Sequence, residues 1–156
     1  ESATSSLIVT PHALQAKPHD WLALTGGSIG QGLPLAIGAS IAKPDRPVIT
    51  LHGDGGAMYT VQALWTQARE NLNITNIIFS NRSYEILKIE LDRVQAVETG
   101  ERAASMFSMD NPPIDWVNLA ESMGVQGYKP KTVKEFKDVF SKSINESGPS
   151  LIEIEI

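Results

Sequence analysis

Hydrophobic and polar positions along the chain follow two repeating patterns. Short apolar runs are typical of buried strands, and they occupy residues 21–24, 48–51, 74–80, 124–128 and 151–156. Between them, apolar residues recur at helical spacing, which predicts helices over residues 30–42, 57–71, 84–94, 115–123 and 133–145. Residues 1–20, with a Ser/Thr cluster and two prolines, are predicted to be irregular. Residues 95–113 are predicted to be the most mobile segment.

Strands that alternate with helices predict an α/β domain. We expect three layers, in which a mostly parallel sheet is covered by helices on both faces. Ligands of such domains bind beyond the carboxyl ends of the strands. Residues 25–30, 52–57 and 80–83 lie at the ends of predicted strands, so we expect them to meet at one edge of the sheet.

Composition and charge exclude several classes of function but do not indicate a particular function. The chain has 156 residues, which fit one domain, so residues 1–156 are predicted to be a single domain. A formal net charge of −5 disfavours binding to nucleic acid or to an anionic membrane, and no apolar run approaches the ~20 residues of a membrane span. The absence of cysteine excludes thiol chemistry and fits a cytoplasmic protein. Because the chain starts at Glu1 without Met or a signal peptide, we interpret it as a fragment of a longer protein.

A glycine-rich turn, Gly53-Asp54-Gly55-Gly56, lies between a predicted strand and a predicted helix. Glycine lets the backbone turn tightly and approach a ligand closely. The N–H groups of Gly55, Gly56 and Ala57, at the start of the helix, suit a phosphate group. Because the Asp54 carboxylate alone would repel that phosphate, the sequence predicts a divalent cation that binds both.

Asn81 comes directly after the next predicted strand. A right-handed strand–helix–strand unit returns the chain to the same edge of the sheet, and neighbouring strands are about 4.8 Å apart. Asn81 can therefore face Asp54 across a cation. Mg²⁺ takes about six oxygen ligands. They could be supplied by the Asp54 carboxylate, the Asn81 amide, the Ser83 carbonyl, two diphosphate oxygens and a water.

These residues resemble a known motif. The segment from Gly53 to Asn81 is similar to the thiamine-diphosphate motif, in which a GDG turn is followed by a double Asn. Three further stretches agree: Gly27-Ser28-Ile29-Gly30, the run from Gly32 to Ala39, and the closing Gly148-Pro149-Ser150-Leu151-Ile152-Glu153. Nearly the whole chain resembles the C-terminal, diphosphate-binding domain of the acetolactate synthase, benzoylformate decarboxylase and pyruvate decarboxylase family, with acetolactate-synthase-like proteins closest.

The resemblance implies a role for each matching residue. Mg²⁺ would be bound by Asp54, Asn81 and the Ser83 carbonyl. The diphosphate would be held by Gly55, Gly56 and Ala57, and by a hydroxyl of Thr4 or Ser5. The aminopyrimidine would contact the Gly27 carbonyl and the Ile29 N–H, while the Ile29 side chain would hold the cofactor in a V shape. Ser28 and Tyr84 complete the expected cofactor-binding set.

The chain also departs from the family pattern. Ser80-Asn81 stands where a double Asn is usual; since the matching metal ligand is the second Asn, metal binding is expected to survive. Arg82 follows Asn81, and Glu85 follows Tyr84 where small residues are frequent, which leaves decarboxylase and carboligase chemistry both open.

The resemblance also implies what this chain lacks. In the family, a glutamate from the N-terminal domain of a partner subunit activates the cofactor, so the chain alone is expected to carry no catalytic residue and to be inactive. The full-length parent would be a lyase or transferase acting on a 2-keto acid, assembled as a homodimer or tetramer.

Two alternatives stay open at this point. The chain could be the diphosphate-binding subunit of a two-chain 2-keto acid decarboxylase. It could also be a non-catalytic phosphate- or nucleotide-binding module, because fold alone does not fix function. Ligand choice separates them, since a nucleotide module should prefer a nucleotide to thiamine diphosphate with Mg²⁺.

Overall fold

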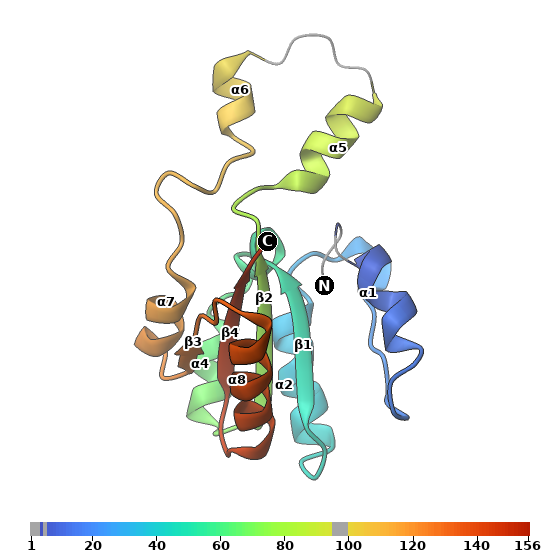
Figure 1. The fold of residues 1–156 in the computed structure, drawn as a ribbon, viewed down its shortest axis with the longest axis vertical. Helices are drawn as coiled ribbons and strands as arrows, with labels where there is room; N and C mark the ends of the chain where they lie inside the picture. The colour runs from blue at the N-terminus through green and yellow to red at the C-terminus, as the bar shows by residue number, and fades with distance from the viewer. Residues whose placement is uncertain (1–3, 5, 95–99) are drawn as a thin grey trace.

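The computed structural model describes residue 4 and residues 6–94 and 100–156. Four parallel strands form one sheet in the order β1-β2-β4-β3 (Figure 1). The strands are β1 (Val48–Gly53), β2 (Ile74–Ser80), β3 (Gln126–Tyr128) and β4 (Ser150–Glu155). The expected α/β fold with a mostly parallel sheet is therefore confirmed.

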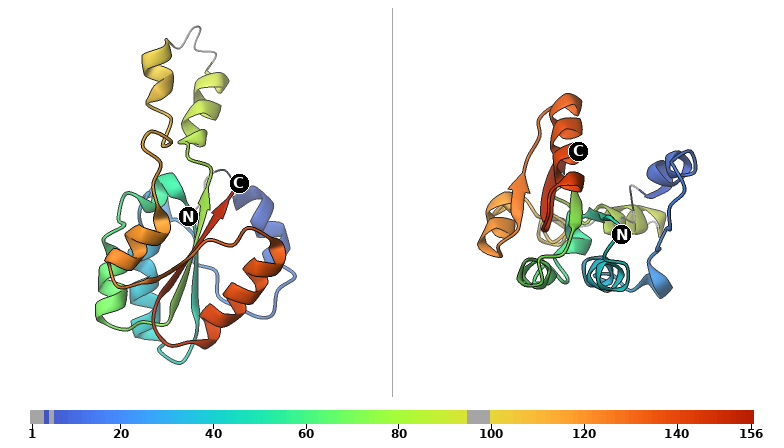
Figure 2. Two further views of the ribbon diagram at one scale, coloured as in Figure 1. Left: turned by 60° about the vertical axis from the view of Figure 1, so that its left-hand side comes forward. Right: turned by 90° about the horizontal axis from the view of Figure 1, so that it is seen from below.

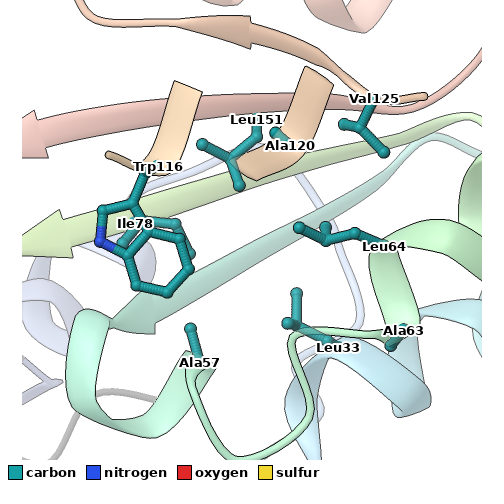
Figure 3. Close-up of a cluster of buried hydrophobic side chains, with 9 residues drawn as sticks. All are labelled: Leu33, Ala57, Ala63, Leu64, Ile78, Trp116, Ala120, Val125 and Leu151. Atoms are coloured by element: carbon teal, nitrogen blue, oxygen red, sulfur yellow. The ribbon is translucent and has the colours of Figure 1, made fainter. Parts of the chain in front are cut away.

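Helices cover both faces of the sheet, as expected. One face carries α2 (Gly32–Ala42), α4 (Ala63–Arg69) and α7 (Trp116–Ser122), whereas α8 (Val133–Asn145) lies on the other (Figure 2). The main core lies under the first group, where Leu33, Leu64, Ile78, Trp116 and Leu151 are each at most 1% exposed (Figure 3). Burial of such side chains is the main favourable contribution to folding.

Helices α5 (Glu85–Arg93) and α6 (Glu101–Ser105) project beyond the carboxyl end of the strands (Figure 1). The chain leaves the carboxyl end of β2 into α5, and α6 returns toward α7. The predicted mobile segment 95–113 contains α6, and its residues 95–99 lie outside the described residues. No helix in the described part of the chain combines the length and apolarity that a bilayer crossing requires.

Three sequence-based predictions of secondary structure are wrong. Residues 21–24 form no strand: Trp21 and Leu22 are 49% and 61% exposed, and β1 pairs only with β2 in the described chain. The helix predicted over 57–71 is split into α3 (Asp54–Ala57) and α4. Here the Thr60 hydroxyl donates to the Gly30 carbonyl at 2.6 Å, so a tertiary hydrogen bond overrides the helical pattern. Within 1–20, predicted to be irregular, Ser6–Ala13 form helix α1.

Candidate functional site

Asp54 lies at the carboxyl end of β1, where α3 begins. Its side chain is 3% exposed. Its Oδ1 accepts a hydrogen bond from the Gly55 N–H at 2.9 Å, and its Oδ2 accepts one from the Arg82 N–H at 2.7 Å. Burial raises the pKa of this carboxyl, although the hydrogen bonds from Arg82 and Gly55 act in the opposite direction. The carboxylate thus joins the ends of two neighbouring strands.

The loop after β2 lies beside Asp54 because β1 and β2 run parallel in a fixed register. Gly53 is paired with Phe79, so the residues that follow both strands meet at one edge. Asn81 Oδ1 accepts a hydrogen bond from the Ser83 N–H at 3.0 Å, which closes a tight turn. The expected meeting of the two strand ends is confirmed, but Asn81 directs its amide oxygen at its own loop in this structure.

At one position of the glycine-rich turn, a neighbouring side chain leaves no room for a residue larger than glycine. A Cβ on Gly55 would lie 2.8 Å from Cδ1 of the Tyr84 ring. Gly55 and Ala57 are buried in α3, and Gly56 between them is partly exposed. The structure therefore brings the turn and the Tyr84 ring into contact.

The second glycine segment lies in an exposed turn. Thr25–Gly27 form a short 3-10 helix, and the Ile29 N–H donates to the Gly27 carbonyl at 2.9 Å across Ser28. Ile29 is 51% exposed. The two backbone groups expected to contact a pyrimidine are thus paired with each other. Of the two candidate hydroxyls, Thr4 lies in a turn ahead of α1, and Ser5 lies outside the described residues.

His52 is buried without a polar role. Its ring is 1% exposed, neither nitrogen has a hydrogen-bond partner, and burial lowers its pKa to about 3. In this structure His52 is therefore a packed side chain of the core.

Arg82 is a residue of the site whose part the sequence did not reveal. Besides its N–H to Asp54, its guanidinium forms ion pairs with Asp110 at 3.1 Å and with Glu155 at 2.5 Å. Glu155 also pairs with Lys129 at 2.8 Å. The one sequence signal for such a part was the position of a charged residue directly after Asn81. The ion-pair partners of Arg82 are too distant in the sequence to be found from residue spacing.

Glu155 gives a pH-dependent contribution to stability. Its hydrogen bonds with Lys129 and Arg82 lower its pKa to about 2 from 4.5. A carboxyl whose pKa is lower in the folded state stabilises the fold above its unfolded pKa, and this contribution is lost as pH falls. We therefore expect the unfolding free energy of wild type to fall between pH 4.5 and 2, and that of Glu155→Gln to fall less. Urea unfolding of both proteins across this pH range measures the difference. If the unfolding free energies of wild type and Glu155→Gln fell in parallel with pH, this contribution of Glu155 would be contradicted.

A metal at this edge must use mixed oxygen ligands. The described residues contain no group of three or more His, Cys, Asp or Glu side chains that could hold an ion. Asp54 offers a carboxylate, and the neighbouring loop offers an amide and backbone carbonyls. These hard oxygen ligands are the type that Mg²⁺ takes, usually with one or two carboxylates plus phosphate and water.

Comparison with known proteins identifies the family of this chain. Residues 3–154 match the family model described as "Thiamine pyrophosphate enzyme, C-terminal TPP binding domain"; thiamine pyrophosphate is thiamine diphosphate. The Mycobacterium tuberculosis protein named "Putative acetolactate synthase large subunit IlvX" is 46% identical over 155 residues, covering 99% of this chain and 30% of that protein. The acetolactate synthase of Bacillus subtilis is 29% identical over 133 residues, covering 83% of this chain and 21% of that enzyme.

A solved structure shows the same fold. The thiamine diphosphate-dependent 4-hydroxybenzoylformate decarboxylase of Rhodococcus jostii RHA1 has a TM-score of 0.74 and 37% identity, covering 83% of this chain and 23% of that one. The chain thus spans about a third or less of the length of these relatives. Because the family model matches almost the whole chain, the protein belongs to the family of C-terminal thiamine pyrophosphate-binding domains.

Proposed function

We propose that this chain holds the diphosphate and the Mg²⁺ of thiamine diphosphate within an acetolactate-synthase-like enzyme that acts on 2-keto acids. The observation that carries the proposal is the buried Asp54 carboxylate, bonded to the backbone of the loop that follows the neighbouring strand. It lies at the carboxyl edge of a parallel sheet, where α/β domains bind their ligands.

The proposed metal ligands are Asp54, the Asn81 amide oxygen and the Ser83 carbonyl. Both Asp54 oxygens accept backbone hydrogen bonds, and each keeps a further lone pair for a cation. Asn81 Oδ1 bonds the Ser83 N–H and has the same capacity. The proposed diphosphate contacts are backbone N–H groups of Gly55, Gly56 and Ala57, in the first turn of α3, where such groups lack backbone partners within the helix. The Gly55 N–H donates to Asp54 Oδ1 in this structure, so its contact with the diphosphate would be shared with that carboxylate.

The proposed pyrimidine contacts require a local change. The Gly27 carbonyl and the Ile29 N–H are bonded to each other at 2.9 Å. Both are exposed, and both flanking glycines have a positive φ, 62° at Gly26 and 91° at Gly30. We propose that this single bond opens when the ring binds, while Ser28, Tyr84 and the Thr4 or Ser5 hydroxyl complete the site.

The whole enzyme would supply the remaining parts. When bound, the cofactor would supply carbanion chemistry toward a 2-keto acid. We propose that the activating glutamate belongs to an N-terminal domain of a partner subunit, that the enzyme is a cytoplasmic homodimer or tetramer, and that this chain alone is inactive. Its residues then bind, orient and hold the diphosphate end.

Ligand choice tests the proposal directly. We expect thiamine diphosphate with Mg²⁺ to raise the melting temperature of this chain, by about 5–10 °C at a hundredfold excess over Kd. Each component alone should give a smaller shift, because metal and diphosphate bind together. Differential scanning fluorimetry with ATP, ADP and Mg²⁺ is the control. A shift with a nucleotide and none with thiamine diphosphate would contradict the proposal and support a nucleotide-binding module.

A further inference from the structure

Arg82 lies in the loop that would carry two metal ligands, between Asn81 and Ser83. Its backbone N–H binds Asp54 at 2.7 Å, and its carbonyl accepts a hydrogen bond from the Met109 N–H at 2.8 Å. The same residue therefore connects β1, the loop after β2 and the segment that returns from α6. Any rotation of this backbone would remove the hydrogen bond to the Asp54 carboxylate.

The backbone of Arg82 needs such support because its conformation is unfavourable. Its φ is +52°, in the left-handed region that residues with a Cβ avoid. Asn71 is the other described non-glycine residue with a positive φ, at +48°, and Asn is one of the residue types that tolerate it. Arginine has no such intrinsic tolerance, so interactions elsewhere must hold it in place.

The guanidinium supplies those interactions on two sides. One nitrogen pairs with Asp110, just after the return from α6, and another pairs with Glu155, at the end of β4. Glu155 is itself aligned by Lys129, which also pairs at 3.1 Å with Glu153. Glu153 is 1% exposed in β4. The exposed pairs thus end in a buried carboxylate, and such a network orders side chains better than an isolated surface pair.

We propose that Arg82 is a positioning residue, whose guanidinium, held by Asp110 and Glu155, fixes the loop after β2. The Arg82 N–H then stays bonded to Asp54. Asn81 and Ser83 stay at the edge of the sheet. The inference gives this residue a part in the proposed metal and diphosphate site and rests on that function. Its structural half, the fixing of the loop, is measurable without any cofactor.

Amide hydrogen exchange of the unliganded chain, followed by NMR, tests that half. In Arg82→Gln we expect the amides of residues 82 and 83 to exchange about threefold to tenfold faster than in wild type, with amides in the centre of β2 unchanged. Arg82→Lys should restore part of the protection, because lysine keeps the charge but lacks the two-sided fork of arginine. Glu155→Gln should act like Arg82→Gln, and the double variant should add little to either.

Two controls separate this role from general stability. Arg46→Gln removes another exposed ion pair, with Asp20, and should leave the exchange of residues 82 and 83 unchanged. Arg82→Gly and Asn71→Gly both relieve a positive φ, so both should keep or raise the melting temperature. Only Arg82→Gly should speed exchange at residue 83.

Binding gives the second readout. With Mg²⁺ and thiamine diphosphate, Arg82→Gln and Arg82→Gly should weaken Kd about threefold to tenfold, while Asn71→Gly and Arg46→Gln should not. Unchanged exchange at residues 82 and 83 in Arg82→Gln would overturn the inference, whatever the binding result. Faster exchange with unchanged Kd would also overturn it. If wild type binds no thiamine diphosphate, the proposed function fails, and the exchange data alone decide whether Arg82 fixes the loop.

Discussion

Replacing Asp54 with asparagine should abolish the magnesium-dependent stabilisation of this chain by thiamine diphosphate. Asparagine keeps the size of the side chain but removes its charge, and a divalent cation beside a diphosphate needs a carboxylate on the protein side. We expect the shift in melting temperature, about 5–10 °C in wild type at a hundredfold excess over Kd, to disappear. Differential scanning fluorimetry with and without Mg²⁺ measures it.

The unliganded Asp54→Asn variant should stay folded, since two effects oppose each other. The amide nitrogen that replaces one carboxylate oxygen can no longer accept the hydrogen bond that Asp54 receives from the Arg82 or the Gly55 N–H, a loss of about 1–3 kcal/mol. Against this, no charge is buried any longer, and burial of that charge is what raises the pKa of Asp54. Each variant is therefore compared with its own unliganded baseline. Asp138→Asn, on the exposed surface of α8, is the matched control and should keep the full shift. Equal shifts in Asp54→Asn and wild type would exclude Asp54 as the metal ligand.

The fold was largely predictable because its signals are local. β2 at 74–80 and α8 at 133–145 have the predicted bounds, since a β-branched run and a capped amphipathic helix each define their own ends. The Thr132 side chain accepts a hydrogen bond from the Glu135 N–H at 3.1 Å, which caps the first turn of α8. Residues 21–24 show the limit, because an apolar run becomes a strand only where a neighbouring strand is available to pair with it.

The site was predictable where it depends on chain order, and not where it depends on distant partners. Parallel register places residues after β1 and β2 together, so the meeting of Asp54 with the Asn81 loop follows from the sequence. No local sequence pattern predicts the ion-pair partners of Arg82. Glu155 comes from the last strand and Asp110 from the segment after α6. The hydrogen bond between the Gly27 carbonyl and the Ile29 N–H could not be predicted from the sequence either, because it depends on the backbone conformation of the turn.

Replacing Gly32 with alanine should destabilise the chain, although alanine favours helices. A Cβ at this position would lie 2.1 Å from Cε1 of His52, a distance at which one group must move. The His52 ring is 1% exposed, so it is enclosed by protein and cannot turn directly into solvent. The start of α2 must then shift away from β1, at a cost of about 1–3 kcal/mol. Thermal or urea unfolding measures the loss.

The same helix supplies the matched control. Gly38 also lies in α2, and a Cβ there would meet nothing within 4 Å. Gly38→Ala should therefore stabilise the chain by about 0.5–1 kcal/mol, through helix propensity alone. In the background of His52→Ala, which removes the ring, Gly32→Ala should cost little. If Gly32→Ala and Gly38→Ala had the same effect, the contact between Gly32 and His52 would not limit this position. Opposite signs would show that close approach of α2 to β1, immediately before Asp54, is what requires glycine at residue 32.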